Sequence, residues 1–375
     1  GSTMKGGLFM ITRNICGIEL DVDPNSANAI YFEKEFADKL ASNEIEAIQT
    51  ALYKNCGVYH PVSVLWEVTN QCNYHCPFCY IHYPNSETLP FLGQAKWSTL
   101  IDDFIAEGML FCTLTGGECL LHPDFPKLYA YLKEHGVIVS IFTNASLLSD
   151  EHFVLFQKLP PYKVEVSLYS MAGNNCCCKK NAENAMKHVL RLKEMGIQVI
   201  CKTPINCETE AECAQIQVWC KKHNIPYYSS VELLPTFEGK SLEHLRAART
   251  LILEEEKSGF RNMAIATKRQ WGYKRKFDCS AGKYSSYISF DLGLYPCISA
   301  YGISIYRQNL SAYSVHECVS RLRNQIEQEK PQVIQDCYGC NYYDVCDRCV
   351  LSCFSSAGNI CHTCADISHG IAQYI

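Results

Sequence analysis

The chain has 375 residues, 47% hydrophobic and 19% charged, which suits one large domain with one or two smaller ones. A formal net charge of -5, without long runs of one sign, argues against a nucleic-acid-binding surface, which needs clustered Lys and Arg. Because no stretch approaches the ~18 apolar residues of a spanning helix and no export signal is evident, we expect a cytoplasmic protein that binds no membrane.

Cysteine is the unusual component, with 24 residues. In a secreted chain this number would indicate disulfides. A cytosolic chain of this size does not need them for stability, so metal ligation is the leading explanation.

Residues 4–60 are predicted to form an N-terminal unit. Two short extended runs, residues 8–12 and 18–22, precede apolar residues at helical spacing over residues 33–54. We expect a hairpin and a helix that rest on a larger domain. This unit is either a simple cap on that domain or an element that recognises a peptide.

Strands and helices alternate over residues 61–260. Helical connections require parallel strands, and a parallel sheet is stable with helices packed against it. We therefore predict an α/β fold, a partial (β/α)6 TIM-type barrel, with its chemistry at the C-terminal ends of the strands. The predicted strands are residues 62–68, 109–114, 137–142, 164–168, 197–202 and 226–233.

Residues 270–375 form the third predicted domain, in which the alternation stops and cysteines gather. A helix is expected over residues 315–329, with little regular structure elsewhere. A loop-rich segment with so many thiols is expected to need metal for its fold.

Three cysteines, Cys72, Cys76 and Cys79, lie on the loop that follows the first predicted barrel strand, spaced x3 and then x2. Three thiolates bind three irons of a [4Fe-4S] cluster and leave the fourth iron open to a substrate or cofactor. The alternative is a zinc site, which normally has four protein ligands and would take His75 as the fourth. The position of the loop favours iron.

This spacing, with Phe78 directly before the last cysteine, resembles the signature of the radical S-adenosylmethionine (SAM) superfamily. The run Thr115-Gly116-Gly117-Glu118, after the second predicted strand, is similar to the glycine-glycine-glutamate motif of that family. The resemblance covers about residues 60–260. It implies that the run contacts the amino group of bound SAM, because paired glycines permit close backbone approach and a carboxylate accepts from an ammonium.

Three further positions match the family less closely. Asn144 closes the third predicted strand, where relatives often have Thr-Asn-Gly, but Ala145 replaces the glycine here. Ser167 and Lys202 end the fourth and fifth strands, where the resemblance implies polar contacts to the ribose and carboxylate of SAM.

The C-terminal cysteines resemble the SPASM extension of radical SAM enzymes, which carries two auxiliary [4Fe-4S] clusters. By that resemblance the inner cluster uses Cys279 and Cys297, with Cys349 or Cys353 as a further ligand. The outer cluster takes three cysteines of the later run and is closed by Cys361 or Cys364. Those three are Cys337, Cys340 and Cys346. A zinc ribbon is the alternative for the paired Cys-x2-Cys motifs.

A run of three thiols, Cys176, Cys177 and Cys178, follows the fourth predicted strand. One of them is a candidate hydrogen-atom donor, because a thiol readily gives hydrogen to a carbon radical. The alternative is a loop that tolerates cysteine without using it.

The resemblance implies an oxidoreductase in which one electron from the cluster cleaves SAM to a 5'-deoxyadenosyl radical, and this radical takes hydrogen from the substrate. Substrates of the SPASM group are commonly peptides, so we expect maturation of a ribosomally made peptide by thioether or carbon–carbon cross-linking or by epimerisation. A flavodoxin or ferredoxin is the expected electron donor. Alternatives are a sulfatase-type protein maturase, a small-molecule radical dehydrogenase and, in another class, a metal-stabilised binding or electron-transfer protein.

Overall fold

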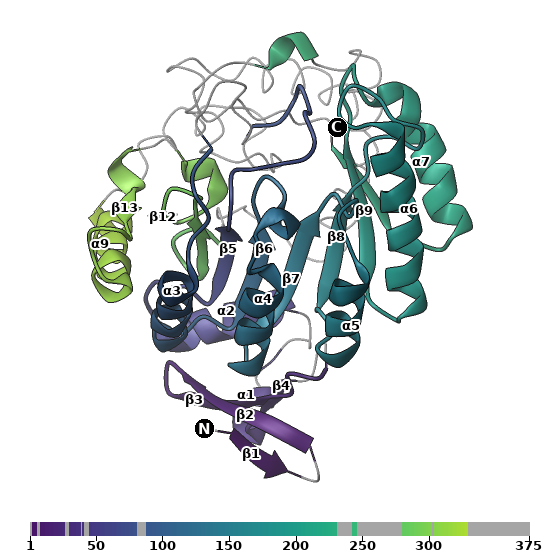
Figure 1. Cartoon of the computed structure of the whole chain (residues 1–375). Helices are drawn as coiled ribbons and strands as arrows, with labels where there is room; N and C mark the ends of the chain where they lie inside the picture. Colours follow the sequence, from purple (N-terminus) through teal and green to yellow (C-terminus); the bar gives the residue numbers. More distant parts are fainter. Residues whose placement is uncertain are drawn as a thin grey trace, which may run out of the picture.

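The computed structural model describes most of the first two predicted domains and part of the third. The described residues are 2–5, 8–26, 30–38, 40, 45–80, 88–230, 242–245, 280–301 and 304–328. Within them the chain forms two sheets, one of four strands near the N-terminus and one of nine strands that spans the rest (Figure 1).

The N-terminal sheet is antiparallel, with the order β1-β2-β3-β4. Its strands are β1 (Ser2–Lys5), β2 (Leu8–Ile15), β3 (Ile18–Val22) and β4 (Ile30–Phe32). The hairpin expected from the sequence is therefore the centre of a larger sheet. The expected single helix is instead two, α1 (Lys34–Ala37) and α2 (Ile45–Cys56). Ser42 and Asn43 lie in the sequence between them, and both residue types favour helix N-termini over helix interiors.

Six parallel strands of the large sheet follow the predicted order and confirm the partial-barrel prediction. They are β5 (Ser63–Glu67), β6 (Phe111–Thr115), β7 (Ile138–Thr143), β8 (Lys163–Ser167), β9 (Val199–Pro204) and β10 (Tyr227–Ser230). Neighbouring strands pair in parallel register, as in Trp66 opposite Leu114. The sheet order runs from β10 at one edge to β13 at the other, so the barrel is open.

Helices pack against one side of these strands. They are α3 (Gln94–Ala106), α4 (Phe125–Glu134), α5 (Asp150–Lys158), α6 (Lys179–Glu194) and α7 (Glu210–Lys222). The main core joins apolar strand residues such as Trp66, Leu114 and Val166 to helix residues such as Phe104 and Leu132. Among the described helices, none combines the length and the apolar character that crossing a bilayer requires.

The opposite face of the strands carries polar side chains, because residues alternate between the faces of a strand. Glu67, Ser140 and Glu165 are buried there, and Lys202 lies beside Glu165. This polar inner face ends at the carboxyl edge of the sheet, where the cysteine loop begins.

The C-terminal strands extend the same sheet, which the sequence did not predict. β11 (Ser285–Ile288) pairs in parallel with β5, and β12 (Gly293–Tyr295) and β13 (Gln308–Asn309) continue it in antiparallel order. The helix expected at residues 315–329 is confirmed as α9 (Val315–Gln328). Short 3-10 turns are η1 (Cys119–Leu121), η2 (Glu243–Leu245), η3 (Ile298–Ala300) and η4 (Ser304–Tyr306).

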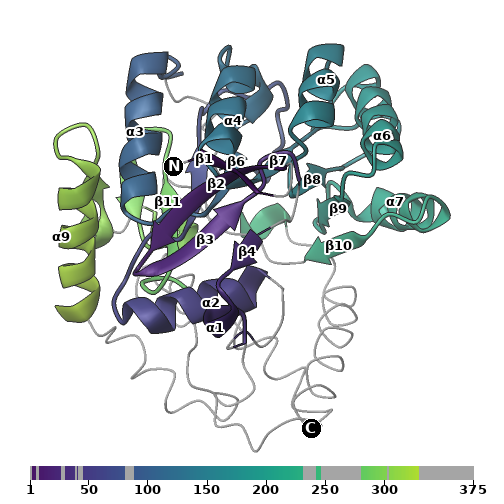
Figure 2. The ribbon, with the colours of Figure 1, turned by 90° about the horizontal axis from the view of Figure 1, so that it is seen from below.

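The N-terminal sheet lies across the end of the barrel at which the parallel strands begin, as Figures 1 and 2 show. Arg13 on β2 fixes it there. The buried guanidinium donates to Ile105 O (3.3 Å), Met109 O (2.7 Å), His135 O (3.4 Å) and Gly136 O (3.1 Å). These carbonyls lie in or directly after the C-terminal turns of α3 and α4, whose dipoles favour a cation. One side chain thus joins the sheet to two barrel helices.

Candidate metal and cofactor site

The three cysteines of the predicted cluster loop follow β5 at the carboxyl edge of the sheet, the upper end in Figure 1. Cys72, Cys76 and Cys79 have intermediate exposure and are not joined in disulfides. Their sulfurs do not all lie within 4.8 Å of one another; among the described residues only Cys16, Cys56 and His60 do.

In this arrangement the three sulfurs do not all point at one position that a single ion could occupy. Two thiolates on one zinc at about 2.3 Å are at most about 4.6 Å apart. A cube of four irons holds its ligands on separate metals and so spreads them further. Three thiolates on one loop fit the three protein-bound irons of a [4Fe-4S] cluster, whereas a structural zinc site normally has four protein ligands.

The loop is held by its own backbone and by the chain after β8. Tyr74 N donates to Cys72 Sγ (3.3 Å), Cys79 N to Cys76 O (3.1 Å) and His75 N to Cys176 O (3.0 Å). Burial raises the pKa of the Cys72 thiol to about 12. Burial therefore disfavours the thiolate of Cys72, and a metal cation beside it would compensate the lost hydration.

Gly116 and Gly117 lie against the start of this loop. A Cβ on Gly116, which has φ +148°, would be 2.4 Å from Thr69 O, and one on Gly117 would be 2.3 Å from Gln71 O. Gly117 N and Glu118 N donate to those same two carbonyls, each at 2.8 Å. The paired glycines therefore bring the β6 loop into contact with the segment that leads to Cys72, a reason for glycine that the motif alone did not give.

Glu118 is buried and connects the ends of β6 and β7. One carboxylate oxygen accepts from Thr143 Oγ1 (2.6 Å) and Leu120 N (3.1 Å), and the other from Asn144 N (2.7 Å). Burial raises the pKa of Glu118, and these donors oppose that shift. The carboxylate orients the two strand-end loops in this structure.

Asn144 connects the β7 end to the cysteine loop itself. Its Nδ2 donates to Asn73 Oδ1 (2.8 Å), and Asn73 donates in turn to Ser146 Oγ (2.9 Å). Ala145 follows with φ +59° and is fully buried. The residue in the family's glycine position thus adopts the left-handed conformation that favours glycine.

Residues 66–209 match the radical SAM superfamily. The matched segment contains the cysteine loop, the glycine pair, Glu118 and Asn144 in the arrangement just described. These residues form a radical SAM domain.

Two relatives and one solved structure show how far the similarity extends. Fe-coproporphyrin III synthase of Methanosarcina barkeri is 29% identical over 201 residues, 51% of this chain and 50% of that protein. The sporulation killing factor maturation protein SkfB of Bacillus subtilis is 28% identical over 169 residues, 43% of this chain and 40% of that protein. The chain therefore matches about half the length or less of these relatives. The fold of Streptococcus suis SuiB bound to S-adenosylmethionine matches with a TM-score of 0.62, at 13% identity, over 93% of this chain and 96% of that one.

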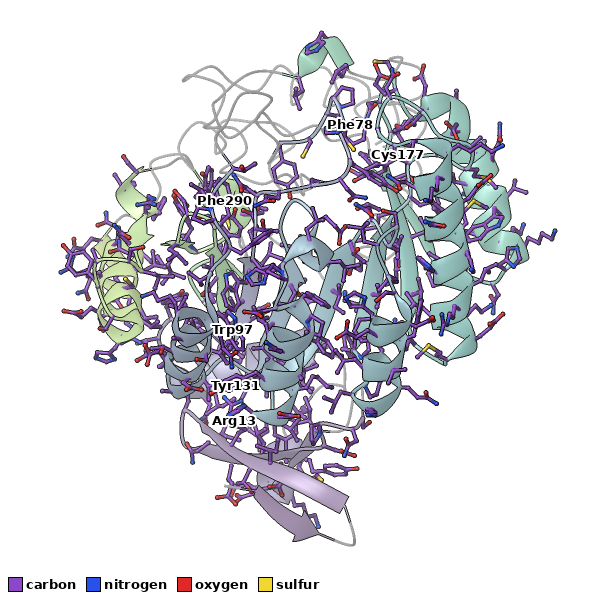
Figure 3. All side chains as sticks on the ribbon, viewed as in Figure 1. Arg13, Phe78, Trp97, Tyr131, Cys177 and Phe290 are labelled. Atoms are coloured by element: carbon purple, nitrogen blue, oxygen red, sulfur yellow. A yellow bond between two sulfur atoms is a disulfide. The ribbon has the colours of Figure 1, made fainter. Side chains whose placement is uncertain are left out.

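Phe78 lies at the upper end of the radical SAM domain, near Cys177 in Figure 3. Its ring makes an edge contact with Tyr169, with centroids 5.1 Å apart. Tyr169 is in turn hydrogen-bonded to Ser167 at the end of β8. Ser167 therefore supports the aromatic residues beside the cysteine loop.

Lys202 lies on the inner face of the radical SAM domain. It forms an ion pair with Glu165, which also pairs with Lys163, and its ammonium lies 5.2 Å from the Phe142 ring centroid. Sequence analysis missed Glu165, because a lone carboxylate in an apolar strand carries no motif. Only strand alternation, which puts it on the face of Ser167, could have indicated it.

The three consecutive thiols after β8 have different environments. Cys176 is buried and hydrogen-bonds with Cys76, while Cys177 is buried and hydrogen-bonds with Tyr74. Cys178 is exposed and precedes α6 as its N-cap residue. The structure therefore brings two of the three candidates to the cysteine loop.

Glu67, the last residue of β5, is a second residue that sequence analysis missed. It is 1% exposed, and among the described residues neither carboxyl oxygen makes a hydrogen bond of good geometry. The Tyr287 hydroxyl of β11 is its neighbour. Burial raises the pKa of Glu67 to about 8.

Of the C-terminal cysteines named as cluster ligands, only Cys297 is described. It follows β12, half-buried, where the chain turns into η3. The others lie outside the described residues: Cys279, Cys337, Cys340, Cys346, Cys349, Cys353, Cys361 and Cys364.

Proposed function

We propose that this chain is a radical SAM enzyme whose catalytic cluster is bound by Cys72, Cys76 and Cys79. The observation that carries the proposal is the set of three cysteines on the loop after β5, at the carboxyl edge of the barrel, which suits a [4Fe-4S] cluster. Three protein ligands leave one iron for the amino and carboxylate groups of SAM. When both are bound, the cluster and SAM would supply a 5'-deoxyadenosyl radical after one-electron reduction.

The protein side chains hold the strand-end loops that would position these groups. Glu118 and Asn144 hold the β7 end against the cysteine loop, and Gly116 and Gly117 pack against the segment that leads to it. Phe78 and Tyr169 cover the loop on the side of β8. The buried Cys176, in contact with Cys76, is the favoured hydrogen-atom donor among the three consecutive thiols.

We infer that the substrate is a ribosomally made peptide. Support comes from the relation to SkfB, described as a maturation protein, and from the N-terminal sheet. Strand β4 is an edge strand, and edge strands accept extended peptides. Beside it is a hollow of about 380 Å³ lined by residues of β2, β3 and β4 and the residue that follows β4: Met10, Glu19, Leu20, Asp21, Tyr31, Phe32 and Glu33. Its three carboxylates favour a basic segment of a leader peptide.

The finer parts of the proposal concern electron flow and outcome. The C-terminal cysteines would hold two auxiliary [4Fe-4S] clusters, which would supply one-electron chemistry, and a flavodoxin or ferredoxin would be the electron donor. A thioether or carbon–carbon cross-link, or an epimerised residue, is the product.

A small-molecule radical reaction is the second candidate, and the relation to Fe-coproporphyrin III synthase favours it. The two candidates share the cluster and the first step. They differ in whether the N-terminal hollow takes part.

Iron content and SAM cleavage test the proposal. After anaerobic reconstitution we expect about twelve irons per chain and formation of 5'-deoxyadenosine with a strong reductant. Replacing Cys72, Cys76 and Cys79 by Ala removes about four irons and abolishes 5'-deoxyadenosine. Cys207→Ser, at an exposed thiol, is the matched control and keeps both. Zinc in place of iron, or no 5'-deoxyadenosine from the wild-type chain, would contradict the proposal.

The substrate class has its own experiment. A peptide encoded beside this protein, incubated with SAM and reductant, changes mass in the presence of the wild-type chain. Glu19→Gln together with Glu33→Gln weakens peptide binding and leaves peptide-free SAM cleavage unchanged. Turnover that is insensitive to both substitutions favours the small-molecule candidate.

A further inference from the structure

Cys16, Cys56 and His60 form a compact group of donor atoms away from the proposed cluster loop. Cys16 is in the turn between β2 and β3, Cys56 ends α2, and His60 follows in the link to β5. The two sulfurs and one imidazole nitrogen all lie within 4.8 Å of one another. Donor atoms this close together can bind the same metal ion.

The backbone around the group is fixed before any ion binds. Asn55 Nδ2 donates to Cys16 O (2.9 Å), which joins the turn to the helix. His60 N donates to Lys283 O (3.1 Å), and Val62 N donates to His60 O (2.8 Å). The two cysteine Cα atoms are 5.2 Å apart. Three elements therefore present their side chains to one point.

The imidazole of His60 is oriented in the way that metal-binding histidines usually are. One ring nitrogen is hydrogen-bonded to the backbone of Glu107, while Nδ1 is buried and has no hydrogen-bond partner in the described part of the chain. A backbone carbonyl on one nitrogen fixes the tautomer and leaves the other lone pair for a metal. A disulfide alone does not explain this buried nitrogen, because a buried polar atom without a partner costs free energy.

In the structure the two cysteines are joined as a disulfide. Two cysteines in contact are not always oxidised: Cys201 and Cys220 hydrogen-bond to each other and remain thiols. Opening the bond takes two electrons and two protons and gives two thiols: a dithiol reductant supplies both and becomes a disulfide, whereas a phosphine supplies the electrons, becomes its oxide, and the protons come from water. Binding of a divalent cation then releases their protons.

We propose that Cys16, Cys56 and His60 bind a single zinc ion when the two cysteines are reduced. Two thiolates and a neutral imidazole are ligands that zinc prefers, and the half-exposed position leaves the fourth place to a solvent molecule. The ion joins the N-terminal sheet and α2 to the strand that enters the barrel. The site differs from the cluster loop in place and in chemistry, and it does not depend on the proposed reaction.

Thiol footprinting of the cluster-loaded full chain tests this proposal. The protein is reduced with a phosphine, divided into portions with zinc and with a zinc chelator, alkylated, and analysed by peptide mass spectrometry at Cys16 and Cys56. We expect zinc to slow alkylation of both thiols by at least about tenfold. Cys207, which is exposed, is the internal control and reacts equally in both portions.

Two variants test the ligand set. His60→Ala loses the protection by zinc, whereas His60→Cys, which retains a third ligand, keeps it. Metal analysis of His60→Ala should show one zinc ion fewer per chain than the wild-type protein and the same iron content. Equal alkylation of wild-type Cys16 and Cys56 with and without zinc would overturn the proposal, as would full protection in His60→Ala.

Discussion

Glu67 shows how a single buried carboxyl makes the fold depend on pH. Its pKa is raised from 4.5 to about 8 by burial, so the native state keeps a proton that the unfolded chain has released. Between these two values the native state binds more protons than the unfolded state. Stability contributed at this position therefore falls as pH rises from about 5 to 8.

Glu67→Gln removes this dependence, because the amide does not ionise. Its free energy of unfolding relative to wild type should increase from pH 5 to pH 8 with a slope of at most ~1.4 kcal/mol per pH unit and level off above pH 8. Denaturant unfolding of both proteins at several pH values measures it. Glu134→Gln, at an exposed position of α4, is the control. A difference that stays flat across this range would refute the assigned pKa.

Gly117 is required by a close contact between two backbone segments. An added Cβ meets Gln71 O at 2.3 Å, and a backbone oxygen cannot move aside without shifting the cysteine loop. We expect Gly117→Ala to lower stability by about 1–3 kcal/mol and to reduce iron incorporation at the proposed cluster.

Gly93→Ala is the matched control, since nothing lies within 4 Å of its added Cβ. Because Gly93 is the N-cap of α3, where Ala is less favourable, this variant should lower stability by about 1 kcal/mol or less and leave iron content unchanged. Thermal unfolding measures the stability of both variants, and iron analysis measures how much cluster each one binds. Equal iron in the two variants would show that the loop tolerates the shift.

At the scale of elements, the N-terminal sheet depends on Arg13 for its attachment. Four carbonyls at the ends of α3 and α4 share this one guanidinium, and burial lowers its pKa to about 10, which still leaves it charged at neutral pH. Arg13→Met should cost about 3 kcal/mol, because it leaves buried carbonyls without a donor. Hydrogen exchange of β2 and β3 should rise more than that of β6 and β7.

Arg191→Met is the comparison for Arg13. Arg191 pairs on the surface with Asp150, which is exposed, so its removal should have a much smaller effect. If both variants exchange hydrogen alike in β2 and β3, Arg13 does not hold the sheet.

The parts of these elements that the sequence predicted are those with local signals. Hydrophobic periodicity placed β5 to β10, and the x3, x2 spacing placed Cys72, Cys76 and Cys79 at a strand end. Arg13 could not be assigned a role, because its partners lie 92 to 123 residues away. The same holds for β11, which reads as part of a loop-rich segment until it pairs with β5, 222 residues earlier.

At the scale of the whole molecule, the sequence motif placed three cysteines on the loop after one strand, but it did not indicate what the glycines and Glu118 contact. Gly116 and Gly117 contact Thr69 and Gln71, and Glu118 accepts from Thr143 and Asn144. These contacts join the ends of three neighbouring strands. They depend on the order of strands in the sheet, which periodicity alone does not provide.

The N-terminal sheet lies at one end of the barrel and the cysteine loop at the other (Figure 1). If a precursor peptide binds along β4, its modified residue must pass the length of a strand, roughly 16 Å, and a layer of helices about 10 Å thick. In extended form this path of roughly 26 Å takes at least about eight residues. The molecule would then act as a ruler: precursors with spacers shorter than this should bind without being modified, which mass spectrometry of a spacer-deletion series would detect.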